Sequence, residues 1–220
     1  MKGLLVALLL AFGPGDVVPE ELVKGDRYES FFYAREIPDD IFDLMQGRSY
    51  KEGCTVPRNS LRYLRLLHRD IDGRAKVGEM VVAASIADDV LDIFRQLFKA
   101  SYPIESVLLV DRFGADDERS MLANNSSSFN FRIAPHSGKI SKHSTGEAVD
   151  INPLYNPYYK VKPDGRTIVD PEVARRYVDR SAKFPYKIEK GDICHRLFLA
   201  HGFKWGGGWA SAKDWQHFEK

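Results

Sequence analysis

The stretch SKHSTGEAVDINP, residues 141–153, constrains the fold more than any other part of the sequence. It sets the acid Asp150 between Val149 and Ile151, and a strand turns alternate side chains to opposite faces. Val149 and Ile151 then pack on one face, and Asp150 lies on the other with small and polar neighbours. A carboxylate in a packed strand is unfavourable unless it is paired or binds a metal. The stretch therefore predicts a strand whose polar face belongs to a site.

A histidine upstream can reach the same polar face. His143 is separated from Asp150 by Gly146, which can turn the chain so that the imidazole lies over the strand. A histidine and an aspartate are two of the three protein ligands of a catalytic zinc site, which keeps a position for water. On residue types alone, a metal site and a buried hydrogen-bonded cluster both remain open.

The third ligand has to come from another part of the chain. In the closing segment DWQHFEK, an alternating strand would turn Trp215, His217 and Glu219 to one face, with Asp214 just before the strand. His217 could then complete the site. Asp214 would be within reach of the same metal, where a zinc hydrolase needs a general base.

The other histidines after the N-terminal region are weaker candidates. Two lie in a predicted helix and one ends a predicted strand, where packing or surface roles are expected. The last lies in a polar loop, where it is a weak candidate ligand and a better candidate for contact with a substrate. The helix contains His195 and His201, the strand ends at His68, and the polar loop contains His136.

Composition and local patterns predict one globular domain. The chain has 220 residues, 44% of them apolar, which is enough to bury a hydrophobic core without the help of disulfides or structural metals. Helices and strands alternate irregularly, so we expect an α+β fold with a mainly antiparallel central sheet flanked by helices. Expected helices cover 38–45, 86–100 with Ser85 as its cap, a segment opening at Asp170-Pro171, and one from Asp192 to Gly202. Expected strands lie within 59–69, 79–83 and 105–113, and a long polar loop covers 114–142.

The N-terminal stretch MKGLLVALLLAFGPG predicts a secretory signal peptide. It has one lysine and then an apolar run, Leu4 to Phe12, that is too short to span a bilayer. We expect residues 1–27 to be signal peptide and linker, 28–220 to be the domain, and the protein to be exported to the periplasm or cell envelope. An N-terminal strand or buried helix is the alternative. Export would permit a disulfide between Cys54 and Cys194, which are otherwise two buried thiols.

The charge pattern gives no sign of a nucleic-acid or membrane partner. The formal net charge is +1, and no block of like charge stands out. We expect a monomer with no stable membrane span.

The motif SKHSTGEAVD fits the pattern S-x-H-x-x-G-x-A-x-D, and DWQHFEK fits a closing D-x-x-H. Together they resemble the zinc D-alanyl-D-alanine carboxypeptidase and L-alanyl-D-glutamate peptidase family, in its VanY-like branch. That family belongs to a wider group with lysostaphin-type enzymes and the hedgehog signalling domain. NNSSSFNFR, DINP and GFKWGGGW strengthen the resemblance, which runs from about Glu79 to the C-terminus and, more weakly, from about Ile37.

The resemblance implies a single hedgehog/D,D-peptidase-like domain that binds one zinc ion. His143, Asp150 and His217 resemble the zinc ligands, and Asp214 resembles the catalytic acid/base. Arg132, in FNFR, resembles the arginine that contacts the substrate and stabilises the developing oxyanion.

Other motif positions have implied structural roles. Ser141 would orient the loop, and Gly146 would allow the turn. The family often has an acid at the position of Gly208, where this chain reads GGGW. This departure leaves the implied ligands intact. It puts in question a hydrogen bond that would support the ligands, or the stiffness of the loop.

The implied function is hydrolysis of peptide bonds in peptidoglycan stem peptides. The bond could be D-alanyl-D-alanine, cut by a carboxypeptidase, or L-alanyl-D-glutamate, cut by an endopeptidase. A non-catalytic zinc-containing cell-wall binding domain is the alternative, although such a domain would be expected to lose Asp214 or Arg132. An α+β domain without metal would leave both motifs unexplained.

Overall fold

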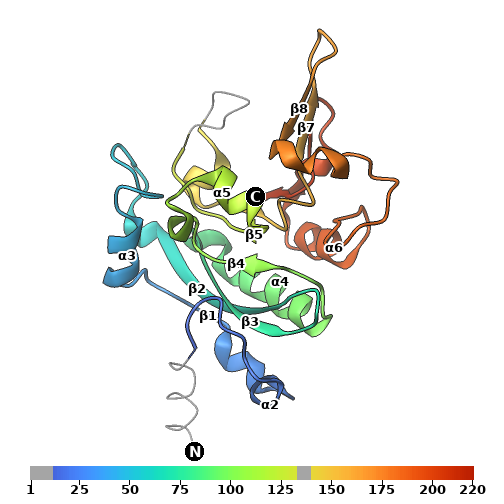
Figure 1. Ribbon diagram of the computed structural model, residues 1–220. Coiled ribbons are helices and arrows are strands. Elements are labelled where there is room, and N and C mark those ends of the chain that lie inside the picture. Colours follow the sequence, from blue (N-terminus) through green and yellow to red (C-terminus); the bar gives the residue numbers. More distant parts are fainter. Residues whose placement is uncertain (1–11, 133–139) are drawn as a thin grey trace, which may run out of the picture.

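Four small sheets organise the residues that the structure, a computed structural model, describes: 12–132 and 140–220 (Figure 1). Three of these sheets have three strands and are antiparallel, and the fourth is a parallel pair. The α+β class with mostly antiparallel pairing is confirmed. The expected central sheet is instead divided, because most strands after residue 100 are only two to four residues long and are separated by loops.

The main core lies between the first sheet and helix α4 (Ala87–Lys99). This sheet has the order β1 (Tyr33–Arg35), β2 (Leu61–Arg69) and β3 (Ala75–Ala83). The expected strands and the helix are present. The cap at Ser85 is wrong, because Ser85 lies in a 3₁₀ turn and α4 begins only at Ala87, without a side-chain cap. The inward face of α4 is buried: Val90, Ile93, Phe94 and Leu97 are at most 1% exposed.

The segment before β1 lies along the edge of β3. The backbone amides of Gly15 and Val18 donate to the carbonyls of Val77 and Ala75, each at 2.8 Å. Val18 and Val23, the latter in helix α2 (Glu20–Val23), are buried in the main core. Part of the expected linker therefore packs on the domain, while the expected signal-peptide residues 1–11 lie outside the described residues.

A second core lies on the other side of the first sheet's strands, under helix α3 (Asp39–Met45), which confirms the expected short helix. Cys54 contacts this second core, whereas Cys194 is fully buried in the main core. Both thiols are free, so the disulfide that export would permit is not formed.

The segment from 105 to 132 differs from its expected form. The strand expected over 105–113 is only β4 (Ser106–Val107), followed by a 3₁₀ turn, Val110–Phe113. Part of the expected polar loop is the short helix α5 (Asp117–Leu122), whose first turn is capped by the Asp116 carboxylate. A second part is β5 (Asn125–Ser126), parallel to β4. The stretch is polar and has no apolar periodicity, but the Asp116 cap stabilises the first turn of α5.

Two further sheets carry the C-terminal part of the chain. One has the order β6 (Ala148–Asp150), β11 (His217–Glu219) and β9 (Lys204–Trp205). The other has the order β10 (Lys213–Asp214), β7 (Tyr158–Val161) and β8 (Thr167–Asp170), and its β7–β8 hairpin projects from the body of the molecule (Figure 1).

The two helices expected near these sheets have different outcomes. Helix α6 (Ile193–Ala200) is capped by Asp192, which accepts a bond from the His195 amide at 2.7 Å, and Gly202 follows it with φ of 82°. Both expected ends are therefore confirmed. The helix expected to open at Asp170 is wrong, because Asp170 ends β8 and only a 3₁₀ helix, Glu172–Tyr177, follows.

Candidate metal centre

A 3₁₀ turn, Lys142–Thr145, positions His143. The Ser141 hydroxyl accepts a hydrogen bond from the His143 amide at 3.2 Å, which is the orienting role expected of Ser141. Gly146 ends the turn with φ of 73°, and a Cβ there would lie 2.6 Å from the Ala83 backbone nitrogen. Only glycine fits, because the backbone is left-handed and passes directly over the end of β3.

Strand pairing places Asp150 and His217 opposite each other. In the antiparallel pair β6–β11, His217 lies across from Asp150, and Phe218 lies across from Val149. Val149 and Phe218 are fully buried in the main core, so the other face carries the polar pair. The alternation expected from the sequence is confirmed in both strands.

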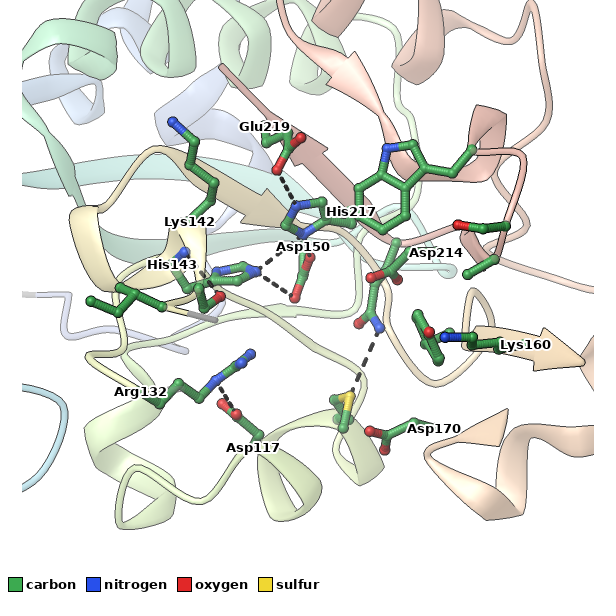
Figure 2. A pocket seen from close by; sticks show the side chains of 18 residues that line it. Asp117, Arg132, Lys142, His143, Asp150, Lys160, Asp170, Asp214, His217 and Glu219 are labelled. Atoms are coloured by element: carbon green, nitrogen blue, oxygen red, sulfur yellow. Dashed lines mark hydrogen bonds and ion pairs between the residues drawn. The ribbon is translucent and has the colours of Figure 1, made fainter. Parts of the chain in front are cut away.

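The structure brings the three expected ligand residues together (Figure 2). His143 Nε2 lies 3.1 Å from Asp150 Oδ2 and 3.2 Å from His217 Nδ1. His217 Nδ1 lies 3.0 Å from Asp150 Oδ1. Within the described residues, this is the group of three or more His, Cys, Asp or Glu side chains that could hold a metal ion, with ligand atoms within 4.8 Å of one another.

Each histidine has an acceptor for its other ring nitrogen. His143 Nδ1 lies 2.7 Å from the Ser128 carbonyl oxygen, and His217 Nε2 lies 3.3 Å from Glu219 Oε2. With their N–H groups donated there, both imidazoles present a lone pair toward Asp150, as metal-binding histidines require. Two such nitrogens and one carboxylate fit the ligand set of zinc.

The charges of the group favour a bound cation. Burial by itself would raise the pKa of Asp150, but the adjacent His143 and His217 hold this pKa below its usual range. Burial would lower the pKa of His217, but Asp150 and Glu219 raise it well above its usual range. Without a metal, protons must therefore balance the carboxylate, and a metal ion can replace them.

Asp214 lines the same cavity from β10. Its Oδ1 is buried and has no hydrogen-bond partner among the described residues. Burial raises the pKa of Asp214 above its usual range. Gly206 allows the chain to pass close to Asp214. A Cβ at this position would lie 2.7 Å from the Asp214 carbonyl oxygen and 3.3 Å from His217 Cβ.

Arg132 also lines the cavity, where its guanidinium forms an ion pair with Asp117 from α5. The Ser144 hydroxyl fixes its backbone, accepting from the Arg132 amide at 2.9 Å and donating to the Arg132 carbonyl at 2.7 Å. In Figure 2 the guanidinium reaches toward His143 and Asp150. The turn that positions His143 therefore positions Arg132 as well.

The other histidines lie away from the group, apart from His136, which is outside the described residues. His68 is buried in β2, with Nδ1 2.7 Å from the Ile104 carbonyl oxygen. His195 packs on Trp205, and His201 forms ion pairs with carboxylates of α4. Packing and surface roles were expected for these three.

The cavity has a volume of about 400 Å³ and contains residues that the sequence did not indicate. Glu219 could have been found as a partner of His217, because alternation places the two on one face. The hairpin residues could not, because only the pairing of β7 with β10 brings them to the site. The lining residues that the sequence did not indicate include Asp117, Tyr158, Lys160, Asp170 and Trp209.

Gly208, where the family often has an acid, faces open space. Apart from its chain neighbours, no atom of the described residues lies within 4 Å of a Cβ built there, in contrast to Gly206 and Gly207. A side chain at this position would therefore begin in open space.

Comparison with known proteins identifies the region that carries this group. The D-alanyl-D-alanine carboxypeptidase family matches residues 135–220, which include His143, Asp150, Asp214 and His217. No curated protein and no solved structure matches the chain. Across the described residues, no helix has the length and apolar character needed to cross a membrane. Residues 135–220 are therefore similar in sequence to the D-alanyl-D-alanine carboxypeptidase family.

Proposed function

We propose that this protein is a zinc-dependent peptidase that hydrolyses peptide bonds in peptidoglycan stem peptides. The observation that carries the proposal is the convergence of His143, Asp150 and His217 in one cavity with Asp214, inside the region that matches a peptidase family. His143 Nε2, His217 Nδ1 and the Asp150 carboxylate would hold the ion. When bound, a zinc ion supplies a Lewis acid that polarises a carbonyl and lowers the pKa of a bound water.

Asp214 would act as the general base and then as the general acid. Its unpartnered, buried oxygen faces the cavity, where it can accept a proton from the attacking water and return it to the leaving amine. A carboxyl group with a raised pKa suits both transfers. Near neutral pH it can take up a proton and release it again more readily than a carboxyl group with an ordinary pKa.

Arg132 would stabilise the negative charge that develops on the carbonyl oxygen. Its ion pair with Asp117 orients the guanidinium, and its backbone bonds to Ser144 limit movement of the chain. Donors that are fixed before the reaction stabilise developing charge without rearranging during it.

The alternative is a domain that keeps zinc and binds the cell wall without cleaving it. The presence of both Asp214 and Arg132 in the cavity favours the enzyme. Incubation of the purified protein with peptidoglycan, with and without a chelator, followed by product masses, tests this. Chelator-sensitive release of D-alanine, or of fragments cut after L-alanine, supports a peptidase and tells the two bonds apart. Binding without any product would leave the non-catalytic domain.

We also propose that the protein is exported, because residues 1–15 have the composition of a signal peptide. N-terminal sequencing of the protein recovered from the cell envelope would test export. A mature chain that still begins at Met1 in the cytoplasmic fraction would contradict it.

A further inference from the structure

One wall of the cavity is built by the β7–β8 hairpin together with β10. In this sheet Tyr158 lies opposite Asp214 on one side and opposite Asp170 on the other. Lys160 is two residues farther along β7 and therefore shares this face, and all four residues line the cavity. Tyr159 points the other way and stacks on Trp215, with ring centroids 6.1 Å apart. The hairpin thus turns its polar face toward the cavity that contains His143, Asp150 and His217.

Among the described residues that line the cavity, carboxylates outnumber lysine and arginine side chains. Five carboxylates line it: Asp117, Asp150, Asp170, Asp214 and Glu219. Of the lysine and arginine side chains in its lining, Arg132 is paired with Asp117, and Lys142 lies 2.8 Å from Glu147 Oε2. Lys160 is half-buried, and its side chain has no hydrogen bond or ion pair with any residue in 12–132 or 140–220. Figure 2 shows its amine directed into the cavity.

We propose that Lys160 binds a carboxylate of the substrate, carried by the residue on the leaving side of the bond that is cut. This inference rests on the proposed peptidase function. The Asp214 carboxylate lines the same wall and would oppose the entry of a substrate carboxylate that met no cation there. Lys160, half-buried and with a side chain unpaired among the described residues, is suited to receive such a carboxylate, because charge-assisted hydrogen bonds are the stronger kind.

The distances suit a carboxylate close to the reacting carbonyl. Lys160 and Asp214 are diagonal neighbours across β7 and β10, a relationship that separates Cα atoms by about 7–8 Å. The residue after a scissile bond lies about 3.8 Å farther along a substrate chain. An extended lysine on this wall can therefore contact a carboxylate on that residue while Asp214 faces the reacting carbonyl.

Two stem-peptide bonds provide such a carboxylate. In a D-alanyl-D-alanine end it is the terminal carboxylate of the last D-alanine. In an L-alanyl-D-glutamate bond formed to the amine of D-glutamate, it is the α-carboxylate of that D-glutamate. The chemistry shared by both is a carboxylate on the leaving residue, and amidation of that group separates the two sources.

The test compares Lys160→Met with Lys162→Met. Lys162 lies on the same hairpin, carries the same charge and is outside the cavity lining. Each zinc-loaded protein is assayed for kcat and KM on an acetylated peptide ending in D-alanyl-D-alanine and on its C-terminal amide. The second pair of substrates is an L-alanyl-D-glutamyl peptide with a free or amidated α-carboxylate.

We expect Lys160→Met to raise KM about 10- to 100-fold on the free carboxylate that the enzyme uses, because a charged hydrogen bond is lost. The variant should match wild type on the amidated partner, and Lys162→Met should match wild type on every substrate. An equal loss on the acid and the amide, or no loss on either, overturns the role of Lys160.

A binding measurement separates this inference from the proposed function. Calorimetry on the metal-free protein compares N-acetyl-D-alanine and N-acetyl-D-glutamate with their α-amides. Wild type should bind one acid more tightly than its amide, and Lys160→Met should lose that preference. If wild type cleaves no peptide but shows this preference, the peptidase proposal fails while Lys160 remains a carboxylate site. Absence of the preference in wild type overturns the inference.

Discussion

Asp150 and His217 face each other across the β6–β11 pair, with 3.0 Å between Asp150 Oδ1 and His217 Nδ1. One strand follows the SKHSTGEAVD motif and the other ends DWQHFEK, so a single backbone register joins both halves of the site. A shift of one residue would turn His217 into the core and Phe218 into the cavity.

Replacement of His217 by Ala should abolish stable zinc binding. Only His143 and Asp150 would remain, and a two-ligand site does not meet the coordination that zinc requires. Metal analysis after dialysis should give near-stoichiometric zinc for wild type and little for the variant. His201→Ala is the control, because His201 pairs with Asp89 and Asp92 away from the group. Full zinc occupancy in His217→Ala would remove His217 from the ligand set.

Replacement of Asp214 by Asn should preserve zinc and lower kcat about 10²- to 10⁴-fold, the usual contribution of a general acid–base residue. Asn keeps the shape of the side chain but cannot accept the proton of the attacking water. Zinc content and peptide hydrolysis are measured on the same preparation. Near-normal kcat with normal zinc would show that another group is the base.

Gly206 and Gly208 should respond differently to the same change. Gly206→Ala places a Cβ 2.8 Å from Asp214 Cβ and should destabilise the fold by about 1–3 kcal/mol while displacing Asp214. Gly208→Ala points into open space and should stay within about 0.5 kcal/mol of wild type. Thermal unfolding and kcat of the two variants check this. Equal behaviour would contradict the close packing of Gly206.

His68 should make the protein less stable in mild acid. Burial lowers the pKa of His68 to about 4 in the folded state, against about 6.5 when unfolded. As the pH falls below 6.5, the unfolded chain takes up the proton first, so the free energy of unfolding decreases until about pH 4. At pH 5 this loss is about 2 kcal/mol relative to pH 7.5.

His68→Asn provides the comparison, since its amide nitrogen can still donate to the Ile104 carbonyl, the partner of His68 Nδ1. Urea unfolding at pH 7.5 and pH 5 should show a smaller loss for the variant than for wild type. The same loss in both proteins would assign the acid sensitivity to other groups.

The sequence predicted those parts of the site that depend on local alternation. Val149 and Asp150 on opposite faces, and His217 on a polar face before Phe218, follow from the two-residue period of a strand. The turn at Gly146 was also predictable, although its close approach to Ala83 was not, because that contact joins distant segments.

Features that depend on long-range pairing or on a single cap escaped prediction. Helix α5 lacks an apolar stripe and begins at the Asp116 cap, so the polar stretch around it suggested a loop. Lys160 reaches the cavity only because β7 pairs with β10, and nothing in its neighbours along the chain indicates this pairing.

The proposed base and the ligand nearest to it in sequence belong to different sheets, with only Trp215 and Gln216 between them. Asp214 is paired with the hairpin, and His217 is paired with the strand that carries Asp150. The hairpin can therefore vary in length and side chains at its tip while β6 and β11 keep their register. If the proposed peptidase activity holds, exchange of the hairpin is a route toward new peptide substrates, because it would leave the three candidate metal ligands in place.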